Sequence, residues 1–297
     1  MRIAVLLLVH DRLAQLNRLV TRLAVDFDVY IHIDKKSTLE AADIAGGDNV
    51  RVIKKYQVHW GSFNQAWATV ELLRIASSGD AYDRYLLISG QDVPIKPNDE
   101  IAAFFSGSDA EYIEYIRLPS PYWEDENGGI DRVTKFHPRS NRGVVGWARH
   151  SLRIEHAVFK MINRVAKPRK IDHEFHGGTN WFNLTGDCVK AMLAYIDAHP
   201  AFIKRFKYTI SADELIFQTI IHDIGFGDRV VSAALRYVDW NSGPEYPRTL
   251  RVADLQKIVD SRMLFARKFD DAVDAEVSSM LYALTAGSRS QAESPVA

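Results

Sequence analysis

The chain begins with the run Met1-Arg2-Ile3-Ala4-Val5-Leu6-Leu7-Leu8-Val9-His10-Asp11, a short apolar core with charge on both sides. The apolar part is too short to cross a bilayer, and no small-residue cleavage site follows it. We therefore expect a buried first strand at residues 2–9, and neither a signal peptide nor a membrane anchor. Asp11 is placed to cap a helix, because apolar residues follow at helical spacing: Leu13, Leu16, Leu19, Val20 and Leu23.

Short β-branched runs alternate with helical patterns along residues 1–117. Strands are predicted at residues 29–33, 50–53 and 85–88, with a helix between the last two. This alternation is typical of an α/β fold with a mostly parallel central sheet flanked by helices. In such sheets ligands bind beyond the carboxyl ends of the strands. We expect a nucleotide platform there, built from Val9, His10, Asp34, Trp60 and Asp92.

The composition limits the classes of function. With 297 residues, of which 47% are hydrophobic and 25% charged, the chain can form one large α/β domain or two small ones. A net charge of -1 gives no overall attraction for nucleic acid, so no nucleic-acid partner is expected. The single cysteine, Cys188, excludes an internal disulfide and a cysteine-based zinc site. A reducing compartment, the cytoplasm, is the expected location.

Proline, glycine, asparagine and charged residues are concentrated at residues 118–147, which predicts a long loop. We expect it to divide one catalytic domain into a nucleotide-binding half, residues 1–117, and an acceptor and catalytic half, residues 118–286. The tail, residues 287–297, is expected to be disordered. Residues 149–170 form a basic amphipathic pattern with two interpretations: a solvated helix face, the commoner case, or a peripheral contact with the inner face of a membrane.

The second half of the chain contains residue types suited to nucleotide-sugar chemistry. Arg267 and Lys268 are adjacent cations, and Glu214 ends the upstream string Ser211-Ala212-Asp213-Glu214. An arginine fork and a lysine point charge can bind the oxygens of a leaving diphosphate without a metal. A single carboxylate can take the proton from an attacking hydroxyl. The combination suggests glycosyl transfer from a nucleotide sugar.

Each of these residues also has a purely structural interpretation. Glu214 stands three positions after Ser211 at the start of a helical pattern, which is the signature of a capping box. Arg267 and Lys268 would point to opposite faces of a regular strand, so both reach one diphosphate only from a loop or bulge. Asp34 could likewise do no more than end a strand, and Trp60 could be a core residue. From spacing alone, both interpretations stay open.

No metal site is expected from the sequence. The pair Asp26 and Asp28 precedes its strand, which places it at the wrong end of the sheet for a catalytic metal. After the fourth predicted strand only one carboxylate is available, Asp92, which is a poor ligand set for a hard cation. One histidine-rich cluster has a spacing that matches no helical zinc pair and is expected at the surface or in an acceptor loop: His173, Glu174 and His176.

Seven short segments, in order along the chain, resemble those of one enzyme family. They are Tyr30-Ile31-His32-Ile33-Asp34-Lys35-Lys36-Ser37, Trp60-Gly61, Leu87-Ile88-Ser89-Gly90-Gln91-Asp92-Val93-Pro94-Ile95, Gly178-Thr179-Asn180-Trp181-Phe182, Ser211-Ala212-Asp213-Glu214, Pro247-Arg248-Thr249-Leu250 and Phe265-Ala266-Arg267-Lys268-Phe269. The sequence is similar to the core-2/I-branching enzymes, the β-1,6-N-acetylglucosaminyltransferases, together with the related peptide O-xylosyltransferases. The ordered set, which runs to Asp270, is more specific than any one segment.

The resemblance implies a GT-A type glycosyltransferase fold and an inverting transfer from a UDP-sugar that needs neither a divalent cation nor another cofactor. By similarity, Glu214 is the general base, while Asp34 and Trp60 help to hold the nucleotide. The diphosphate is assigned to three cations, Arg248, Arg267 and Lys268. Since indole faces stack on sugar rings, the acceptor is expected beside Trp181 and Trp240, with polar contacts from Asn180 and Asp213.

We therefore expect a metal-independent inverting glycosyltransferase that moves N-acetylglucosamine or xylose from a UDP-sugar to a saccharide or glycolipid hydroxyl, forming a β-linkage. Two alternatives stay open: a metal-dependent relative that uses Asp92, and a sugar-binding protein that has kept the fold without the chemistry. Animal members of the family are Golgi membrane proteins with several disulfides, whereas this chain has one cysteine. Asn180 stands where the xylosyltransferase branch tends to have an acidic residue, which leaves the acceptor open.

Overall fold

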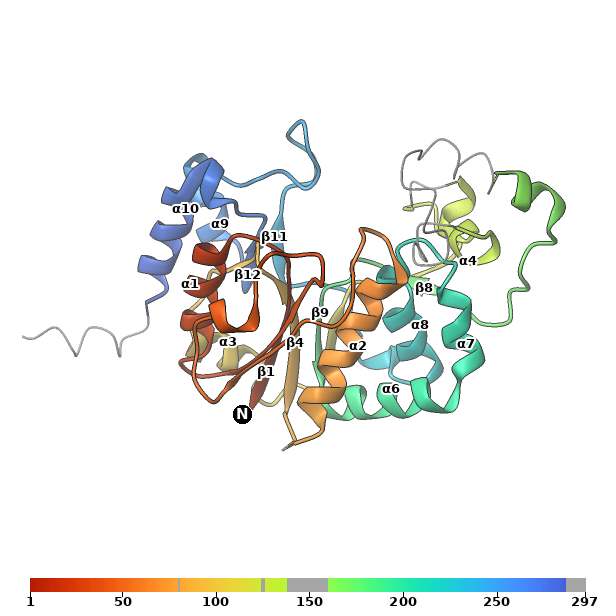
Figure 1. Ribbon diagram of the computed structural model, residues 1–297, viewed down its shortest axis with the longest axis horizontal. Coiled ribbons are helices and arrows are strands. Elements are labelled where there is room, and N and C mark those ends of the chain that lie inside the picture. The colour runs from red at the N-terminus through yellow and green to blue at the C-terminus, as the bar shows by residue number, and fades with distance from the viewer. Residues whose placement is uncertain (80, 124–125, 138–159, 287–297) are drawn as a thin grey trace, which may run out of the picture.

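The computed structural model describes residues 1–79, 81–123, 126–137 and 160–286. Within these residues, the centre is a seven-stranded sheet in the order β10-β6-β9-β4-β1-β2-β3 (Figure 1). Its strands are β1 (Ile3–Val9), β2 (Asp28–Ile33), β3 (Val50–Ile53), β4 (Arg84–Ser89), β6 (Glu111–Ile113), β9 (Phe182–Thr185) and β10 (Val230–Val231). β1 pairs in parallel with β2 and β4, and β2 with β3, as predicted. Because β9 runs antiparallel to β4 and β6, the sheet is mixed but mostly parallel.

Helices cover both faces of the sheet. β1 divides its side chains between them: Val5 and Leu7 belong to the apolar cluster under α1, and Ala4 and Leu6 to the cluster under α2. Burial on both faces explains why the parallel strands are continuous apolar runs. The first face carries α1 (Leu13–Leu23) and α3 (Asn98–Phe105), and the second carries α2 (Phe63–Ser77), α6 (Gly186–Ala198), α7 (Pro200–Phe206) and α8 (Ile216–Asp223). The predicted α/β architecture is confirmed.

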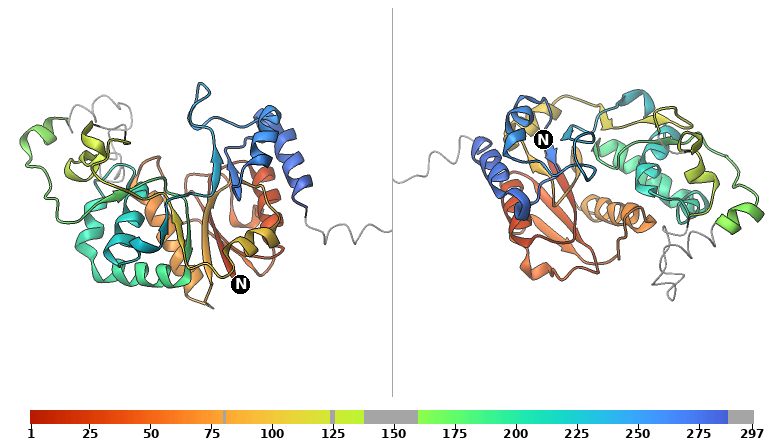
Figure 2. Two further views of the ribbon diagram at one scale, coloured as in Figure 1. Left: turned by 180° about the vertical axis from the view of Figure 1, so that it is seen from behind. Right: turned by 90° about the horizontal axis from the view of Figure 1, so that it is seen from above.

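A smaller sheet lies beyond the carboxyl end of β4. It has the order β11-β12-β5, with strands β5 (Val93–Pro94), β11 (Arg236–Val238) and β12 (Phe265–Arg267). Apolar side chains of β5 and β12 pack with α9 (Leu255–Asp260) and α10 (Asp271–Leu284). The C-terminal helices, blue in Figure 2, lie beside the red N-terminal elements. The end of the chain is therefore part of the same body as its beginning.

Specific hydrogen bonds join the segment after β12 to the start of α1 and to the turn after β4. The guanidinium of Arg12 donates to both carboxylate oxygens of Asp270, with its Nε at 2.8 Å. Gln15 Nε2 donates to the carbonyl oxygens of Gly90, at 2.9 Å, and Phe269, at 3.2 Å. The start of α1, the turn after β4 and the string 265–270 are thereby joined.

The remaining elements are short. β7 (Ile116–Arg117) pairs with β8 (His176–Gly177), and α4 (Asp131–Thr134) lies in the region predicted as a long loop. Short 3-10 helices are η1 (Ala41–Asp43), η2 (Glu126–Gly129), η4 (Ala212–Glu214), η5 (Gly227–Arg229) and η6 (Val252–Asp254). The central sheet takes strands from both proposed halves, since β9 and β10 follow residue 118.

One local prediction is wrong, and others fall outside the described residues. Arg12, not Asp11, precedes α1; it adopts a left-handed conformation, and no side chain caps the helix. Asp11 instead accepts a hydrogen bond from the Arg12 guanidinium at 2.6 Å. The membrane-contact pattern, residues 149–170, lies partly outside the described residues, because 138–159 are not described. The predicted tail, residues 287–297, lies wholly outside them. Among the residues described, no helix is long and apolar enough to span a membrane.

Candidate active site

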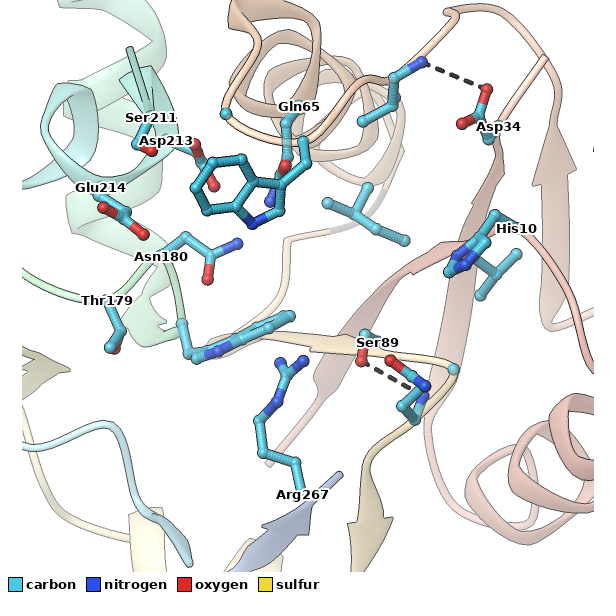
Figure 3. A pocket seen from close by; sticks show the side chains of 18 of the residues that line it. His10, Asp34, Gln65, Ser89, Thr179, Asn180, Ser211, Asp213, Glu214 and Arg267 are labelled. Atoms are coloured by element: carbon cyan, nitrogen blue, oxygen red, sulfur yellow. Dashed lines mark hydrogen bonds between the residues drawn. The ribbon is translucent and has the colours of Figure 1, made fainter. Parts of the chain in front are cut away.

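A cavity of about 630 Å³ opens beyond the carboxyl ends of β1, β2 and β4 (Figure 3). Val9 and His10 line it at the end of β1, and Asp34 lines it at the end of β2. Trp60, which follows β3, is 75% exposed at its edge and is not a core residue. The volume is typical of small-molecule sites. The cavity lies at the edge of the sheet where the strand pattern predicts a ligand-binding site.

The carboxylate of Asp34 is oriented by the backbone. Its Oδ1 accepts hydrogen bonds from the N–H groups of Lys36, at 2.9 Å, and Val58, at 3.2 Å. The Lys36 ammonium lies 3.2 Å from Oδ2. Asp34 therefore ends β2 and also presents a fixed acceptor to the cavity, so the two interpretations of this residue are compatible.

The structure places Asp92 beneath the cavity rather than on its wall. It is buried, and Oδ2 accepts from the backbone N–H of Ser89 at 2.8 Å, which closes the turn after β4. Oδ1 accepts from Arg236 Nε at 3.1 Å, and Oδ2 lies 3.8 Å from Arg267 NH1. Asp92 thus neutralises cations from the small sheet and is not among the lining residues expected to contact the donor.

Arg267 brings a buried positive charge to the cavity wall. It ends β12, and its guanidinium lies over the ring of Trp181, 4.2 Å from the ring centroid. Its Nε and NH1 atoms have no hydrogen-bond partner among the described residues. Burial lowers the pKa of Arg267, and the charge of Asp92 opposes that effect, but an arginine stays ionised in proteins. A buried guanidinium with unused N–H groups is a ready site for a phosphate.

The other two predicted diphosphate cations are already paired. The ammonium of Lys268 lies 3.1 Å from Glu245 Oε2, and Lys268 does not line the cavity. Arg248 donates from Nε to Asp239 at 2.9 Å and from NH2 to Asp254 at 2.6 Å. The three cations are therefore not equivalent, and Arg267 is the one among them that lines the cavity.

Glu214 lines the opposite wall of the cavity from η4 (Figure 3). The capping-box interpretation is wrong: Ser211 is left-handed, its side chain caps no helix, and α8 begins later, at Ile216. The Glu214 carboxylate accepts a hydrogen bond from Arg132 NH1 at 2.6 Å. Arg132 lies 4.7 Å over the ring of Trp123, so the region predicted as a long loop positions this carboxylate.

Asp213 is buried next to Glu214 and also lines the cavity. Burial raises the pKa of Asp213 to about 8, and the negative charge of Glu214 acts in the same direction. Its Oδ1 has no partner within the described part of the chain. At neutral pH Asp213 is therefore a protonated acid that can donate a hydrogen bond into the cavity.

The remaining predicted acceptor residues also line the cavity. Asn180 is buried, and its Nδ2 has no hydrogen-bond partner in the residues that the structure describes. Trp240 is 50% exposed and lies in the loop that precedes β12. Trp181 is mostly buried, and its ring contacts the guanidinium groups of Arg267 and Arg236. Trp240 thus has more free surface for a sugar than Trp181.

Several residues of this site were missed by the sequence analysis. Arg132 had no local signal, because its contact with Glu214 joins positions 82 residues apart. Arg236 stands in an ordinary short strand, and only its contact with Asp92 reveals its role. Thr179 could have been found, since it precedes Asn180 within a segment already singled out.

Potential metal ligands behave differently at two places. Asp28 begins β2 and pairs with Ala4 of β1, at the end of the sheet away from the cavity, where the sequence pattern predicted it. The expectation of surface or loop histidines is wrong for His176, which is buried in β8. His176 and Glu174 meet His222 of α8, and their ligand atoms all lie within 4.8 Å of one another.

Comparison with known proteins identifies the chain. A family model for the Core-2/I-branching enzymes matches residues 3–259. The chain belongs to this family of glycosyltransferases. Together with the mixed sheet described above, membership confirms the GT-A type α/β fold expected from the sequence.

Among curated relatives, xylosyltransferase 2 of Homo sapiens is 27% identical over 308 residues, and xylosyltransferase 1 of Canis lupus familiaris is 25% identical over 312. Both alignments cover 94% of this chain but only 33% and 30% of the relatives. The Core-2/I-branching chain thus spans about a third of their length. Among solved structures, the galactosyltransferase LgtC with donor and acceptor sugar analogues gives a TM-score of 0.43 at 8% identity, covering 96% of this chain and 95% of LgtC.

Proposed function

We propose that this protein is an inverting glycosyltransferase that moves N-acetylglucosamine or xylose from a UDP-sugar to a saccharide hydroxyl, without a metal at the diphosphate. One observation carries the proposal: the guanidinium group of Arg267 and the carboxylate group of Glu214 line the same cavity. An anion-binding group and a proton acceptor on opposite walls are what an in-line displacement requires.

On the donor side, the nucleotide lies along the rim formed by His10, Asp34 and Trp60, which the carboxyl ends of the strands bring together. The diphosphate lies against the guanidinium group of Arg267, which lines the cavity and whose side chain is 13% exposed. Lys268 contributes when its ammonium leaves Glu245, a pair whose carboxylate is half-exposed and thus weakly held. The charge of these side chains takes the place of a divalent cation.

On the acceptor side, Glu214 takes the proton of the attacking hydroxyl. The hydroxyl oxygen forms the new bond to the anomeric carbon while the bond from that carbon to the diphosphate breaks. The electron pair of the broken bond leaves with the β-phosphate, and UDP is released with its new charge opposite Arg267. Because this is a single displacement, the configuration at the anomeric carbon inverts and the product is a β-linkage. The hydrogen bond from Arg132 holds the Glu214 carboxylate in place on the cavity wall.

The choice of donor rests on the relatives. The curated relatives named xylosyltransferase 2 favour xylose, and the name of the family, which refers to branching enzymes, favours N-acetylglucosamine. A saccharide acceptor fits the exposed ring of Trp240 and the unpaired amide of Asn180, which supply one stacking surface and one hydrogen-bond donor.

The test is a panel of UDP-sugars, each incubated with the protein and a mixture of saccharide acceptors in EDTA, with the release of UDP as the measurement. We expect release from UDP-N-acetylglucosamine or UDP-xylose at a rate unchanged by added Mn²⁺ or Mg²⁺. Heat-inactivated protein gives the background. Activity that disappears in EDTA and returns with Mn²⁺ would support the metal-dependent alternative, although Asp92 is buried and already paired with two arginines.

A further inference from the structure

A second cluster of chemically active side chains lies outside the cavity. Glu174 Oε1 lies 3.6 Å from His176 Nε2 and 3.6 Å from His222 Nε2. None of the three residues is among those that line the cavity. They come from the strand β8 and its preceding turn and from the last turn of α8. The fold, not the sequence spacing, therefore assembles this group.

The orientation of the two rings is informative. His176 Nδ1 lies 3.3 Å from the carbonyl oxygen of Glu174, and His222 Nδ1 lies 3.2 Å from a carboxylate oxygen of Asp223. Both neighbours are hydrogen-bond acceptors, so each neutral ring carries its proton on Nδ1. The lone pairs of both Nε2 atoms then face Glu174 Oε1. Histidines that bind a metal through one ring nitrogen commonly donate the N–H of the other nitrogen to an acceptor, which fixes the orientation of the ring.

Three acceptor atoms facing one another need a positive charge between them. The rings stack with centroids 4.7 Å apart, and Tyr115 stacks on His176 at 4.3 Å, so His176 cannot turn away. Arg117 lies 2.9 Å from Glu174 Oε2 and leaves Oε1 to the histidines.

We propose that Glu174, His176 and His222 bind a divalent transition metal, with Zn²⁺ the best fit to two imidazoles and one carboxylate. Ligand atoms of a tetrahedral zinc site are about 3.3–3.4 Å apart, given bonds of about 2.0–2.1 Å. The two separations between Glu174 Oε1 and the histidine nitrogens are 3.6 Å, and all the ligand atoms lie within 4.8 Å of one another, so the side chains must move closer together when the metal binds. The side chains of Glu174 and His222 are partly exposed, at 35% and 37%, so water can reach the fourth position.

The metal would join two elements that build the helix-side wall of the cavity. β8 leads through Gly178 to Thr179 and Asn180, and α8 follows η4, which carries Glu214. The backbone N–H of Gly178 donates to the carbonyl oxygen of Glu214 at 3.0 Å. A metal clamp between β8 and α8 would therefore hold the wall that carries the base without touching the donor. This role is structural and independent of the proposed charge-based handling of the diphosphate.

The test is zinc titration of the chelator-treated, tag-free protein by calorimetry, together with thermal unfolding with and without Zn²⁺. We expect one Zn²⁺ per chain and a higher unfolding temperature with zinc. His222→Ala and Glu174→Gln should each weaken zinc binding at least about tenfold and abolish the thermal shift. His199→Ala, which removes an exposed histidine outside the cluster, should bind zinc as the unchanged protein does.

Cobalt gives an independent readout, because tetrahedral Co²⁺ absorbs visible light where octahedral Co²⁺ barely does. The unchanged protein and His199→Ala should show this absorption, and Glu174→Gln should not. Glu174 is partly exposed, so this variant decides the matter if His222→Ala does not fold. The proposal is overturned if the unchanged protein binds no stoichiometric zinc, or if both cluster variants bind it as tightly as His199→Ala.

Discussion

The two walls of the cavity present different chemical groups and are built in different ways. The strand wall, defined by Val9, His10, Asp34 and Arg267, presents a buried guanidinium with unused N–H groups. The helix wall, defined by Thr179, Asn180, Asp213 and Glu214, presents two carboxyl groups, of which one is neutral by burial and one is paired with Arg132. Negative charge leaving a sugar would thus move toward the first wall, and a proton toward the second.

This difference shows how one small cavity can present an arginine and a glutamate at once. The cation is balanced from behind by Asp92, which does not reach the cavity, so the front of the guanidinium stays available. The base is balanced from its side by Arg132, so its charge is held without blocking the cavity. Each wall can therefore be altered separately by substitution, with effects of different size.

Glu214→Gln removes the proton acceptor of the helix wall and should lower the rate of transfer about a thousandfold, the usual scale for a general base. UDP binding, measured by calorimetry, should change less than about twofold, because the strand wall is intact. Glu276→Gln, an exposed glutamate on α10, is the matched control. Normal turnover of Glu214→Gln would show that the helix wall does not carry the base.

Arg267→Ala removes the buried cation of the strand wall and should lower kcat/KM about a hundredfold, since one charge-stabilising donor is worth that much in comparable sites. UDP binding should weaken in parallel, unlike in the previous variant. Arg262→Ala, a change at an exposed arginine near β12, should leave both quantities unaltered. If Arg267→Ala keeps its UDP affinity, the diphosphate lies elsewhere.

Asp213→Asn tests the neutral acid of the helix wall through stability. The pKa of Asp213 is raised from 3.8 to about 8, so the folded carboxyl stays protonated while the unfolded one ionises. The free energy of unfolding of the natural chain should therefore fall as pH rises from about 4 to 8, and Asp213→Asn should lack this component. Urea unfolding at pH 4.5 and 8 should show that the free energy of unfolding of the variant, relative to the natural chain, is higher at pH 8 than at pH 4.5 by about 4 kcal/mol. An equal difference at both pH values would mean that Asp213 is ionised when folded.

Lys268→Ala should have the smallest effect, a threefold to fivefold weakening of both UDP binding and transfer, on the scale of about 1 kcal/mol for an exposed charge. Glu245→Gln is the informative partner, because it frees the lysine and should slightly strengthen UDP binding. Salt should reduce both effects. If Lys268→Ala weakens UDP binding and Glu245→Gln strengthens it, Lys268 contacts the donor. If both variants change UDP binding in the same direction, the ion pair has only a structural role.

The strand wall could be predicted because it follows from local pattern. An apolar run followed by a polar residue fixes the end of a parallel strand, and parallel strands end at one edge, which brought His10 and Asp34 together. The sequence pattern could not predict in which direction a side chain points within the turn that follows a strand. Asp92 follows its strand as predicted, but it turns inward to accept from Ser89 and Arg236.

The helix wall could be predicted only in part. The segments that contain Asn180 and Glu214 stood out through their resemblance to a family, not through their spacing. Arg132, the partner of Glu214, did not stand out, because the two residues lie 82 positions apart in the sequence. Spacing also favoured a capping box where the chain forms a left-handed turn at Ser211, since tertiary packing there overrides a local preference.

The late position of β12 in the chain sets an order for biosynthesis. Strands β1 to β4 leave the ribosome first and can already pair, but Arg267 arrives only with the small sheet, and Arg12 and Gln15 can hold that corner only after Phe269 and Asp270 have emerged. A nascent chain therefore contains strands β1 to β4 long before it contains Arg267. Under the proposed function, binding of a nucleotide sugar would require that this last strand has already docked.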